Sequence, residues 1–278
     1  MACAQNIQTH IINLERSPKR KKYMLKEVER VSLPNVNIFT AVDAETMVIP
    51  KRYKPYAWKH YWEMASSEIA CFESHILLWE KCLMENKGPY LILEDDIIIS
   101  NQLRSTIETL KNYTKKFDLI HLDAPAPFNR LGPQEDLGGI KIAKILRPIP
   151  STAAYLVTPT GADKLLKKIK NGYCDHADDF ITRKHKGYDP YQLLPTMAIQ
   201  GMFAKSSSIN PVIKISDRTS SPKLNKKLQK GPIIYRTIKE FYRCVQKIKL
   251  KFILNKNQQK KPEIKKFVPL ASDLSKYE

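Results

Sequence analysis

The stretch Pro89-Tyr90-Leu91-Ile92-Leu93-Glu94-Asp95-Asp96 passes abruptly from apolar to acidic side chains. Its first five residues form an apolar run of strand length, which predicts a buried β-strand. Three adjacent carboxylates at the end of such a strand repel one another, and aspartate is a poor strand residue. Folding does not gain from this arrangement, so we interpret the triplet Glu94-Asp95-Asp96 as a ligand-binding segment rather than a solvated acidic turn.

Side chains alternate along an extended chain, so Glu94 and Asp96 are expected to point the same way. Two carboxylates on one side suit a hard divalent cation, Mn²⁺ or Mg²⁺, that holds a diphosphate. Asp95 is then available for the hydroxyl groups of a sugar or a ribose. We therefore predict that Glu94 and Asp96 ligate a metal and that Glu94 and Asp95 also contact the bound ligand.

The surrounding segments predict a sheet whose strands alternate with helices. Further strands are expected at residues 10–14, 35–40, 117–122 and 153–157, and helices at residues 66–86 and 159–170. This pattern predicts an α/β fold with a mixed, partly parallel sheet flanked by helices. Ligands of such sheets bind at the carboxyl ends of strands, so Asn13, the acidic triplet and Asp123 are expected near one edge.

Positive charge is concentrated in the C-terminal quarter of the chain. The net charge is +19 over 278 residues, but residues 205–278 alone hold 19 Lys/Arg against 5 Asp/Glu. The first 204 residues hold 28 Lys/Arg against 23 Asp/Glu. We therefore predict a catalytic domain at residues 1–204 and a separate basic, partly helical tail at residues 205–278.

The tail contains a stretch with strict four-three spacing of apolar residues. They are Ile234, Ile238, Phe241, Val245, Ile248 and Phe252, and the positions between them include Arg236, Lys239, Arg243, Lys247, Lys249 and Lys251. This is the pattern of a basic amphipathic helix that lies on an anionic bilayer surface. The alternative is that the apolar stripe packs on the catalytic domain and the lysines are merely solvated.

The cysteines and the lengths of the apolar runs indicate in which cellular compartment the protein is expected. Five scattered cysteines make a poor disulfide framework and suit a reducing compartment. Cys71 and His75 have the spacing of a metal-ligand pair, but no second Cys/His pair follows at zinc spacing, so we favour core packing and expect no structural zinc. No secretory signal and no apolar run of roughly 18 residues is present, so we expect a cytoplasmic protein.

Two further groups of residues carry chemistry. Arg16 and Arg20 follow the first predicted strand, where their guanidinium groups suit a phosphate. Asp178 and Asp179 precede an apparent helical turn, where they either supply a general base or cap the helix. The chain has no P-loop and no GxGxxG, so the usual ATPase and dinucleotide fingerprints are missing.

Six segments, in order and over roughly residues 8–210, resemble glycosyltransferase family 25, the bacterial lipooligosaccharide galactosyltransferase family that includes relatives acting on collagen. They are IINLERSPKR (11–20), AVDA around Asp43, EIACFESHILLW (68–79), LILEDD (91–96), TAAYLVTPTGADKL (152–165) and DDF (178–180). The resemblance implies a GT-A-like fold, a UDP-sugar donor, commonly UDP-galactose, and an inverting transfer.

The resemblance also implies roles for individual residues. It places Asn13, Arg16, Arg20 and Asp43 on the donor side, and Glu94, Asp95 and Asp96 at the family's acidic DxD-like motif. Glu68, Ser74 and His75 match its helical signature, either as catalytic residues or as a buried hydrogen-bond network that supports the site. Asp178 or Asp179 is implied as the base, and the choice stays open because His176-Ala177 stand where a proline is expected.

We therefore predict an inverting glycosyltransferase that moves a hexose, galactose from UDP-galactose, onto a lipid-linked lipooligosaccharide or lipopolysaccharide core saccharide at the inner face of the cytoplasmic membrane. UDP-glucose and UDP-N-acetylglucosamine are alternative donors. A nucleic-acid-binding protein is the alternative from another class, but no recognised motif is present and aromatic residues are not interleaved with the basic ones. An inactive scaffold is a third alternative, against which the acidic triplet argues.

Overall fold

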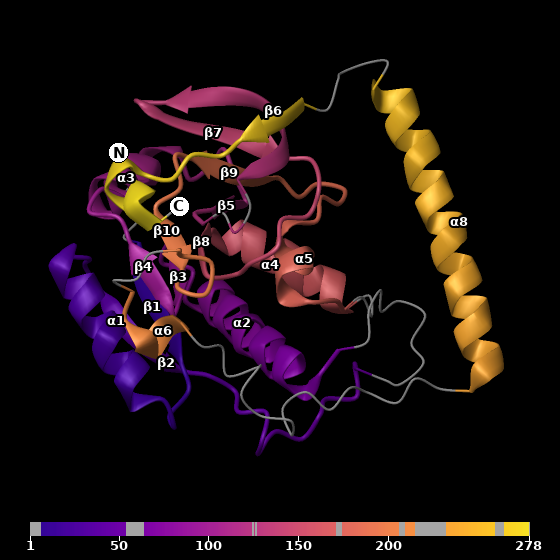
Figure 1. Ribbon diagram of the computed structural model, residues 1–278, viewed down its shortest axis with the longest axis horizontal. Helices are drawn as coiled ribbons and strands as arrows, with labels where there is room; N and C mark the ends of the chain where they lie inside the picture. The colour runs from indigo at the N-terminus through magenta and orange to yellow at the C-terminus, as the bar shows by residue number, and fades with distance from the viewer. Residues whose placement is uncertain are drawn as a thin grey trace.

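The computed structural model describes residues 7–53, 64–123, 125, 127–170, 174–205, 209–214, 232–258 and 264–277. Its centre is a nine-stranded sheet with the strand order β11-β6-β7-β9-β5-β8-β3-β1-β2 (Figure 1). The strands are β1 (Gln8–Asn13), β2 (Val36–Thr40), β3 (Tyr90–Glu94), β5 (Leu119–His121), β6 (Phe128–Leu137), β7 (Ile140–Ile145), β8 (Ala154–Val157), β9 (Pro190–Leu194) and β11 (Ile264–Phe267). Two more strands, β4 (Ile97–Ile99) and β10 (Ala198–Gln200), form a separate antiparallel pair.

The sheet is mixed. Strand β1 pairs in parallel with β2 and β3, and β5 pairs in parallel with β9. Strand β8 lies antiparallel between β3 and β5. This confirms the predicted α/β class with a mixed sheet flanked by helices.

Helices cover both faces of the sheet, and the alternation of side chains along β3 shows how. Leu91 and Leu93 pack into a core cluster with residues of α1 (Pro18–Arg30) and α3 (Leu103–Leu110). Tyr90 and Ile92 point the other way, into a cluster with α2 (Ser66–Glu85), α4 (Pro159–Lys170) and α5 (Ala177–Thr182). The shorter elements are η1 (Lys111–Tyr113), α6 (Pro211–Lys214) and η2 (Ser272–Tyr277). All of β3 except Glu94 is buried, so the strand stays inside the core up to the residue where the acidic triplet begins.

The C-terminal residues return to the central sheet. Strand β11 pairs antiparallel with β6, pairing Ile264 with Leu131. After it, Val268, Ala271 and Leu274 are buried, and Asp273 accepts a 2.7 Å hydrogen bond from the Ser100 hydroxyl. The segment that we expected to be one separate tail therefore contains both a helix and an edge strand of the main sheet.

Helix α8 (Ile233–Gln258) lies along one side of the molecule (Figure 1). It carries the predicted apolar stripe, and Ile234, Phe241 and Ile248 are 75%, 71% and 54% exposed. Packing of the stripe on the catalytic domain, the alternative considered above, is therefore not what the structure has at these positions. No helix in the described part of the chain combines the length and the apolar composition that a membrane span requires.

Candidate functional site

Polar residues from several strands meet at one edge of the sheet. The strand register pairs Ile12 with Glu94, Leu93 with Ala154 and His121 with Tyr155. Because β1, β3 and β5 run in the same direction, Asn13, Glu94 and Asp123 follow or end their strands at the same edge. The predicted common edge is confirmed. Strand β8 runs the opposite way, so the residues that precede it, Ser151 and Thr152, arrive at this edge as well.

A cleft of about 370 Å³ opens at this edge, a size typical of small-molecule sites. Its lining includes most of the predicted site residues, namely Arg16, Arg20, Glu68, Ser74, His75, Glu94, Asp95, Asp96 and Asp178. The exposed side chains of Met202 and Phe203 also line it and add an apolar surface of the kind that nucleoside and sugar rings stack on. The sequence spacing did not point to these two residues.

Asp95 connects the strand end of β3 to the loop after β1. Its carboxylate accepts a 2.6 Å hydrogen bond from Asn13 Nδ2 and a 3.1 Å hydrogen bond from Arg20 Nη1. Burial raises the pKa of Asp95, and the charge of Arg20 and the hydrogen bond from Asn13 oppose that rise. The structure thus brings together three predicted donor-binding residues and holds Arg20 at the cleft with only 11% of its side chain exposed.

Glu94 and Asp96 converge on one amide group. Gln200 Nε2 donates to Asp96 Oδ2 at 2.9 Å and to Glu94 Oε2 at 3.5 Å. Asp96 is buried, and its Oδ1 atom accepts no hydrogen bond from any residue that the structure describes. Burial, reinforced by the charges of Glu94 and Asp95, raises the pKa of Asp96 to about 7. The carboxylates of Glu94 and Asp96 thus lie close together, and the buried Oδ1 atom of Asp96 is left without a hydrogen bond from the described residues. Carboxylate oxygens are the ligands that a hard divalent cation takes.

Arg16 and Asp43 form an ion pair beside the cleft. Burial tends to raise the pKa of Asp43, but hydrogen bonds from Arg16 and from the Glu45 amide outweigh it and lower the pKa. Arg16 lines the cleft and one third of its side chain is exposed, whereas Asp43 does not line it. Arg16 therefore faces the cleft, and Asp43 lies behind it as its ion-pair partner.

Two residues of the α2 signature support the site through the backbone. Ser74 accepts a 2.9 Å hydrogen bond from the Val42 amide, which fixes the loop after β2 against α2. Glu68 accepts a 2.6 Å hydrogen bond from the Ala65 amide at the start of α2, and it lies 3.4 Å from His176 Nδ1. Both contacts fit the supporting network that we considered for this signature.

His75 is fully buried at the floor of the cleft. Its Nδ1 atom lies 2.9 Å from the Tyr155 hydroxyl, which also accepts a 2.9 Å hydrogen bond from Trp79 Nε1. Its Nε2 atom lies 3.7 Å from Glu94 Oε1, beyond hydrogen-bond distance. Burial lowers the pKa of His75, but the neighbouring Cys71 and Glu94 raise it more, to about 9.

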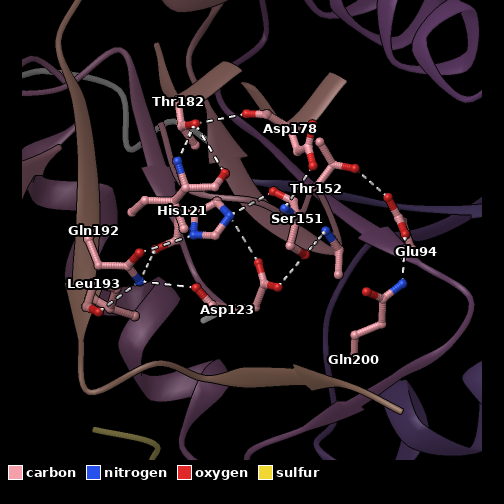
Figure 2. Close-up of polar contacts among 12 residues, drawn as sticks. Glu94, His121, Asp123, Ser151, Thr152, Asp178, Thr182, Gln192, Leu193 and Gln200 are labelled. Atoms are coloured by element: carbon pink, nitrogen blue, oxygen red, sulfur yellow. Dashed lines mark hydrogen bonds and ion pairs between the residues drawn. The ribbon is translucent and has the colours of Figure 1, made fainter. Parts of the chain in front are cut away.

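The two aspartates of α5 differ in their surroundings. Asp178 lines the cleft, and its Oδ2 atom accepts a 3.4 Å hydrogen bond from the Ser151 amide (Figure 2). Asp179 does not line the cleft and pairs with Arg183 Nη2 at 3.0 Å. Burial raises the pKa of Asp179, and Arg183 opposes the rise. The geometry separates a carboxylate that faces the cleft from one that holds α5 to the following loop.

A buried polar cluster lies behind Asp178, and Figure 2 shows its contacts. Asp123 accepts a 2.5 Å hydrogen bond from the Ser151 hydroxyl and lies 3.1 Å from His121 Nε2, while Gln192 Oε1 lies 3.1 Å from His121 Nδ1. Ser151 has a φ of 103°, an unusual conformation for a residue with a side chain. Asp123 itself does not line the cleft, so it acts on the site through Ser151.

Sequence reasoning missed Ser151, Thr152 and Gln200. Thr152 donates a 2.5 Å hydrogen bond to Glu94 Oε1, and Gln200 joins Glu94 to Asp96. Ser151 and Thr152 directly precede a predicted strand, and only the knowledge that this strand runs antiparallel would have placed them at the site. Gln200 reaches the triplet because β10 pairs with β4, a pairing that no local pattern revealed.

Comparisons with known proteins agree with the motifs. The profile of "Glycosyltransferase family 25 (LPS biosynthesis protein)" matches residues 6–182. A glycosyltransferase 25 family member of Aedes aegypti is 29% identical over 57% of this chain, and the match spans 28% of that relative. A probable inactive glycosyltransferase 25 family member 3 of Rattus norvegicus is 25% identical over 57% of this chain and 29% of its own length. The lipooligosaccharide biosynthesis protein lic2B of Haemophilus influenzae is 22% identical over 69% of this chain and 75% of its own.

Proposed function

Because the chain belongs to glycosyltransferase family 25, we propose that it transfers a hexose, galactose from UDP-galactose, to a lipooligosaccharide or lipopolysaccharide core saccharide with inversion at the anomeric carbon. The observation that carries this proposal is the convergence of Glu94 and Asp96 on Gln200 Nε2 in the same cleft that Asp178 lines. The acidic pair meets the needs of a diphosphate-bound cation, and the third carboxylate meets the need for a base.

Glu94 and Asp96 are the residues that would hold Mn²⁺ or Mg²⁺. The buried Oδ1 atom of Asp96, which has no partner among the described residues, supports this assignment, because burying such an oxygen without a partner costs about 1–3 kcal/mol. When bound, the cation offsets the negative charge that develops on the departing UDP. Arg16 and Arg20 line the same cleft and contribute positive charge for the diphosphate.

Asp178 is the proposed base. Its carboxylate takes the proton from the attacking acceptor hydroxyl while that oxygen bonds to the anomeric carbon and the bond from the anomeric carbon to UDP breaks. The hydrogen bond from the Ser151 amide orients Asp178, and the cluster of Asp123, His121 and Gln192 fixes Ser151 in turn. Asp179 forms an ion pair with Arg183, so we assign it the role of holding α5 to the following loop.

Helix α8 is proposed to hold the protein on the anionic inner face of the cytoplasmic membrane, where a lipid-linked acceptor is displayed. The exposed apolar stripe supports this, because such residues gain by burial among lipid chains while Arg236 and Lys239 meet the headgroups. A surface-bound enzyme meets a surface-bound acceptor at a raised effective concentration.

The proposal is tested by incubating the purified chain with UDP-galactose, UDP-glucose and UDP-N-acetylglucosamine, with and without a lipooligosaccharide acceptor, and measuring UDP release. We expect acceptor-dependent release that is fastest with UDP-galactose and is lost in EDTA. Faster release with another UDP-sugar would replace galactose, and activity that persists in EDTA would remove the cation from the mechanism. No release with any donor would overturn the proposed reaction.

A further inference from the structure

Three potential ligands of a soft metal ion meet at the floor of the cleft. Cys71 Sγ, His75 and Glu94 each offer one ligand atom, and these atoms lie within 4.8 Å of one another. Cys71 and His75 lie four residues apart in α2, so they project from one face of that helix, and Glu94 reaches them from the end of β3. The spacing argument found no second Cys/His pair because the third ligand comes from a different element.

The imidazole has an unused nitrogen aimed at this cluster. His75 is completely buried, and its Nε2 atom has no hydrogen-bond partner in the described part of the chain. The Tyr155 oxygen accepts from Trp79 and has a second lone pair for His75 Nδ1–H, and Nε2, the ring nitrogen that faces Glu94, can bind a metal ion once it gives up its proton. Metal-bound histidines are commonly fixed through their other ring nitrogen in this manner.

We propose that Cys71, His75 and Glu94 form a binding site for Zn²⁺ or a similarly soft divalent ion. A thiolate, an imidazole and a carboxylate are a ligand set that zinc takes, whereas Mg²⁺ and Mn²⁺ prefer oxygen ligands alone. Tetrahedral zinc with bonds of about 2.0–2.3 Å holds its ligand atoms closer together than the 4.8 Å limit, so the three side chains must move inward when the ion binds.

The site has an open fourth position. All three residues line the cleft, so a water molecule or a substrate group can complete the coordination, as in zinc sites with three protein ligands. Thr152 holds Glu94 Oε1 on this side, while Glu94 Oε2 faces Gln200 and Asp96. The two oxygens of Glu94 therefore face two different cation positions. Zinc binds a thiolate and a neutral imidazole, so its affinity for this site should fall as the pH is lowered.

Cobalt(II) provides the test, because a cobalt–thiolate bond gives a charge-transfer absorption band in the near ultraviolet. The full chain is titrated with Co²⁺ under reducing conditions, without donor or acceptor, as wild type, as Cys71→Ser and as Cys244→Ser. Cys244 is an exposed cysteine of α8 and serves as the control. We expect a band that saturates at one equivalent in wild type and Cys244→Ser, with affinity at least about 100-fold weaker and no thiolate band in Cys71→Ser.

Further measurements make the result decisive. Zn²⁺ should displace Co²⁺ and bleach the band, and excess Mg²⁺ should leave it in place. Zn²⁺ should also raise the unfolding temperature of wild type and not that of Cys71→Ser, which shows at the same time that the variant is folded. Absence of the band in wild type, or an equal band in Cys71→Ser, would overturn the site.

One consequence rests on the proposed function. Because Glu94 belongs to both cation positions, Zn²⁺ should inhibit UDP release, and added Mn²⁺ should relieve this only at high excess. The cobalt titration does not depend on transfer, so a protein that binds Co²⁺ but releases no UDP would retain this inference and lose the proposed reaction. A protein that transfers galactose but shows no cobalt–thiolate band would retain the proposed reaction and lose the metal site.

Discussion

The cleft and helix α8 depart from ordinary folding preferences in opposite ways. At the cleft, three consecutive carboxylates are held at a strand end, with Asp95 and Asp96 only 8% and 6% exposed. On α8, large apolar side chains such as Ile234 and Phe241 are exposed along a helix whose other faces carry cations. Buried charge and exposed hydrophobic surface both cost free energy in a protein without its ligands.

The difference indicates two kinds of missing partner. The cleft offers negative charge and an unpartnered oxygen at a fixed geometry, which suits a small ligand that carries cations with it. The helix offers a long apolar stripe with positive charge at its flanks, which suits an extended anionic surface. A test of either region should therefore leave the other unchanged.

The largest effect is expected from Asp96→Asn. It replaces one of the two carboxylate ligands of the proposed cation with a neutral amide, so we expect turnover to fall by about three to four orders of magnitude. Burial raises the pKa of Asp96 to about 7, which means that the ionised side chain opposes folding at higher pH. Asparagine carries no such cost, so the unfolding temperature at pH 8 should rise.

UDP release and thermal unfolding are measured on the same preparation. Lost turnover together with an equal or higher unfolding temperature would show that Asp96 is needed for activity and not for stability. Normal turnover would remove Asp96 from the mechanism, and a lower unfolding temperature would show that the carboxylate stabilises the fold.

The next largest effect should separate the neighbouring aspartates of α5. Asp178→Asn should lower transfer about 10²–10³-fold while donor binding is retained, because the lost group acts only on the acceptor proton. Asp179→Asn is the matched control, since Asp179 pairs with Arg183 outside the cleft. Donor affinity is measured by calorimetry and transfer by product formation. Loss of transfer in Asp179→Asn alone would reverse the assignment.

These two residues also show how far the sequence could lead. The contrast between the apolar run and the carboxylates was enough to predict that Glu94 and Asp96 lie at a strand end, and strand order placed Asn13 at the same edge. The choice between Asp178 and Asp179 needed the position of Arg183, which follows from the way α5 turns into the next loop. Gln200 and Ser151 depended on antiparallel pairings between distant segments, and so did the return of β11 to the sheet, which the charge pattern concealed.

A smaller effect is expected from the apolar stripe of α8. The combined variant Ile234→Ser, Phe241→Ser and Ile248→Ser should weaken co-sedimentation with anionic vesicles at least about tenfold, because three exposed side chains lose their transfer into lipid. Truncating the chain before or after α8 is a poorer test, since either truncation also removes β11, which belongs to the sheet. Transfer to a small soluble acceptor should be unchanged.

Val48 and Met84 supply the control for this experiment. They are 89% and 80% exposed and lie outside α8, so Val48→Ser with Met84→Ser removes exposed apolar surface without touching the stripe. The control should sediment as wild type does. Equal loss in both variants would point to general hydrophobicity, and undiminished binding of the α8 variant would contradict the anchoring proposal.

The smallest effect tests whether buried ionisable groups outside the cleft are merely structural. His10 lies within β1, is 1% exposed and packs on the ring of Tyr90 with centroids 4.2 Å apart. Burial, assisted by the charge of Lys81, lowers its pKa from 6.5 to about 4. The unfolded chain therefore takes up a proton as the pH falls below 6.5, while the folded protein does not until about pH 4. Between these values the free energy of unfolding should decline by up to about 3 kcal/mol on account of His10.

His10→Phe keeps an aromatic ring against Tyr90 and cannot titrate, so the free energy of unfolding, measured in urea at pH 7 and pH 4.5, should decline less than in wild type. UDP release should stay at the wild-type rate, because His10 touches no residue of the cleft machinery. An unchanged pH dependence would show that His10 is protonated or hydrated in the fold, and a loss of transfer would mean that the packing of His10 in β1 is coupled to the cleft.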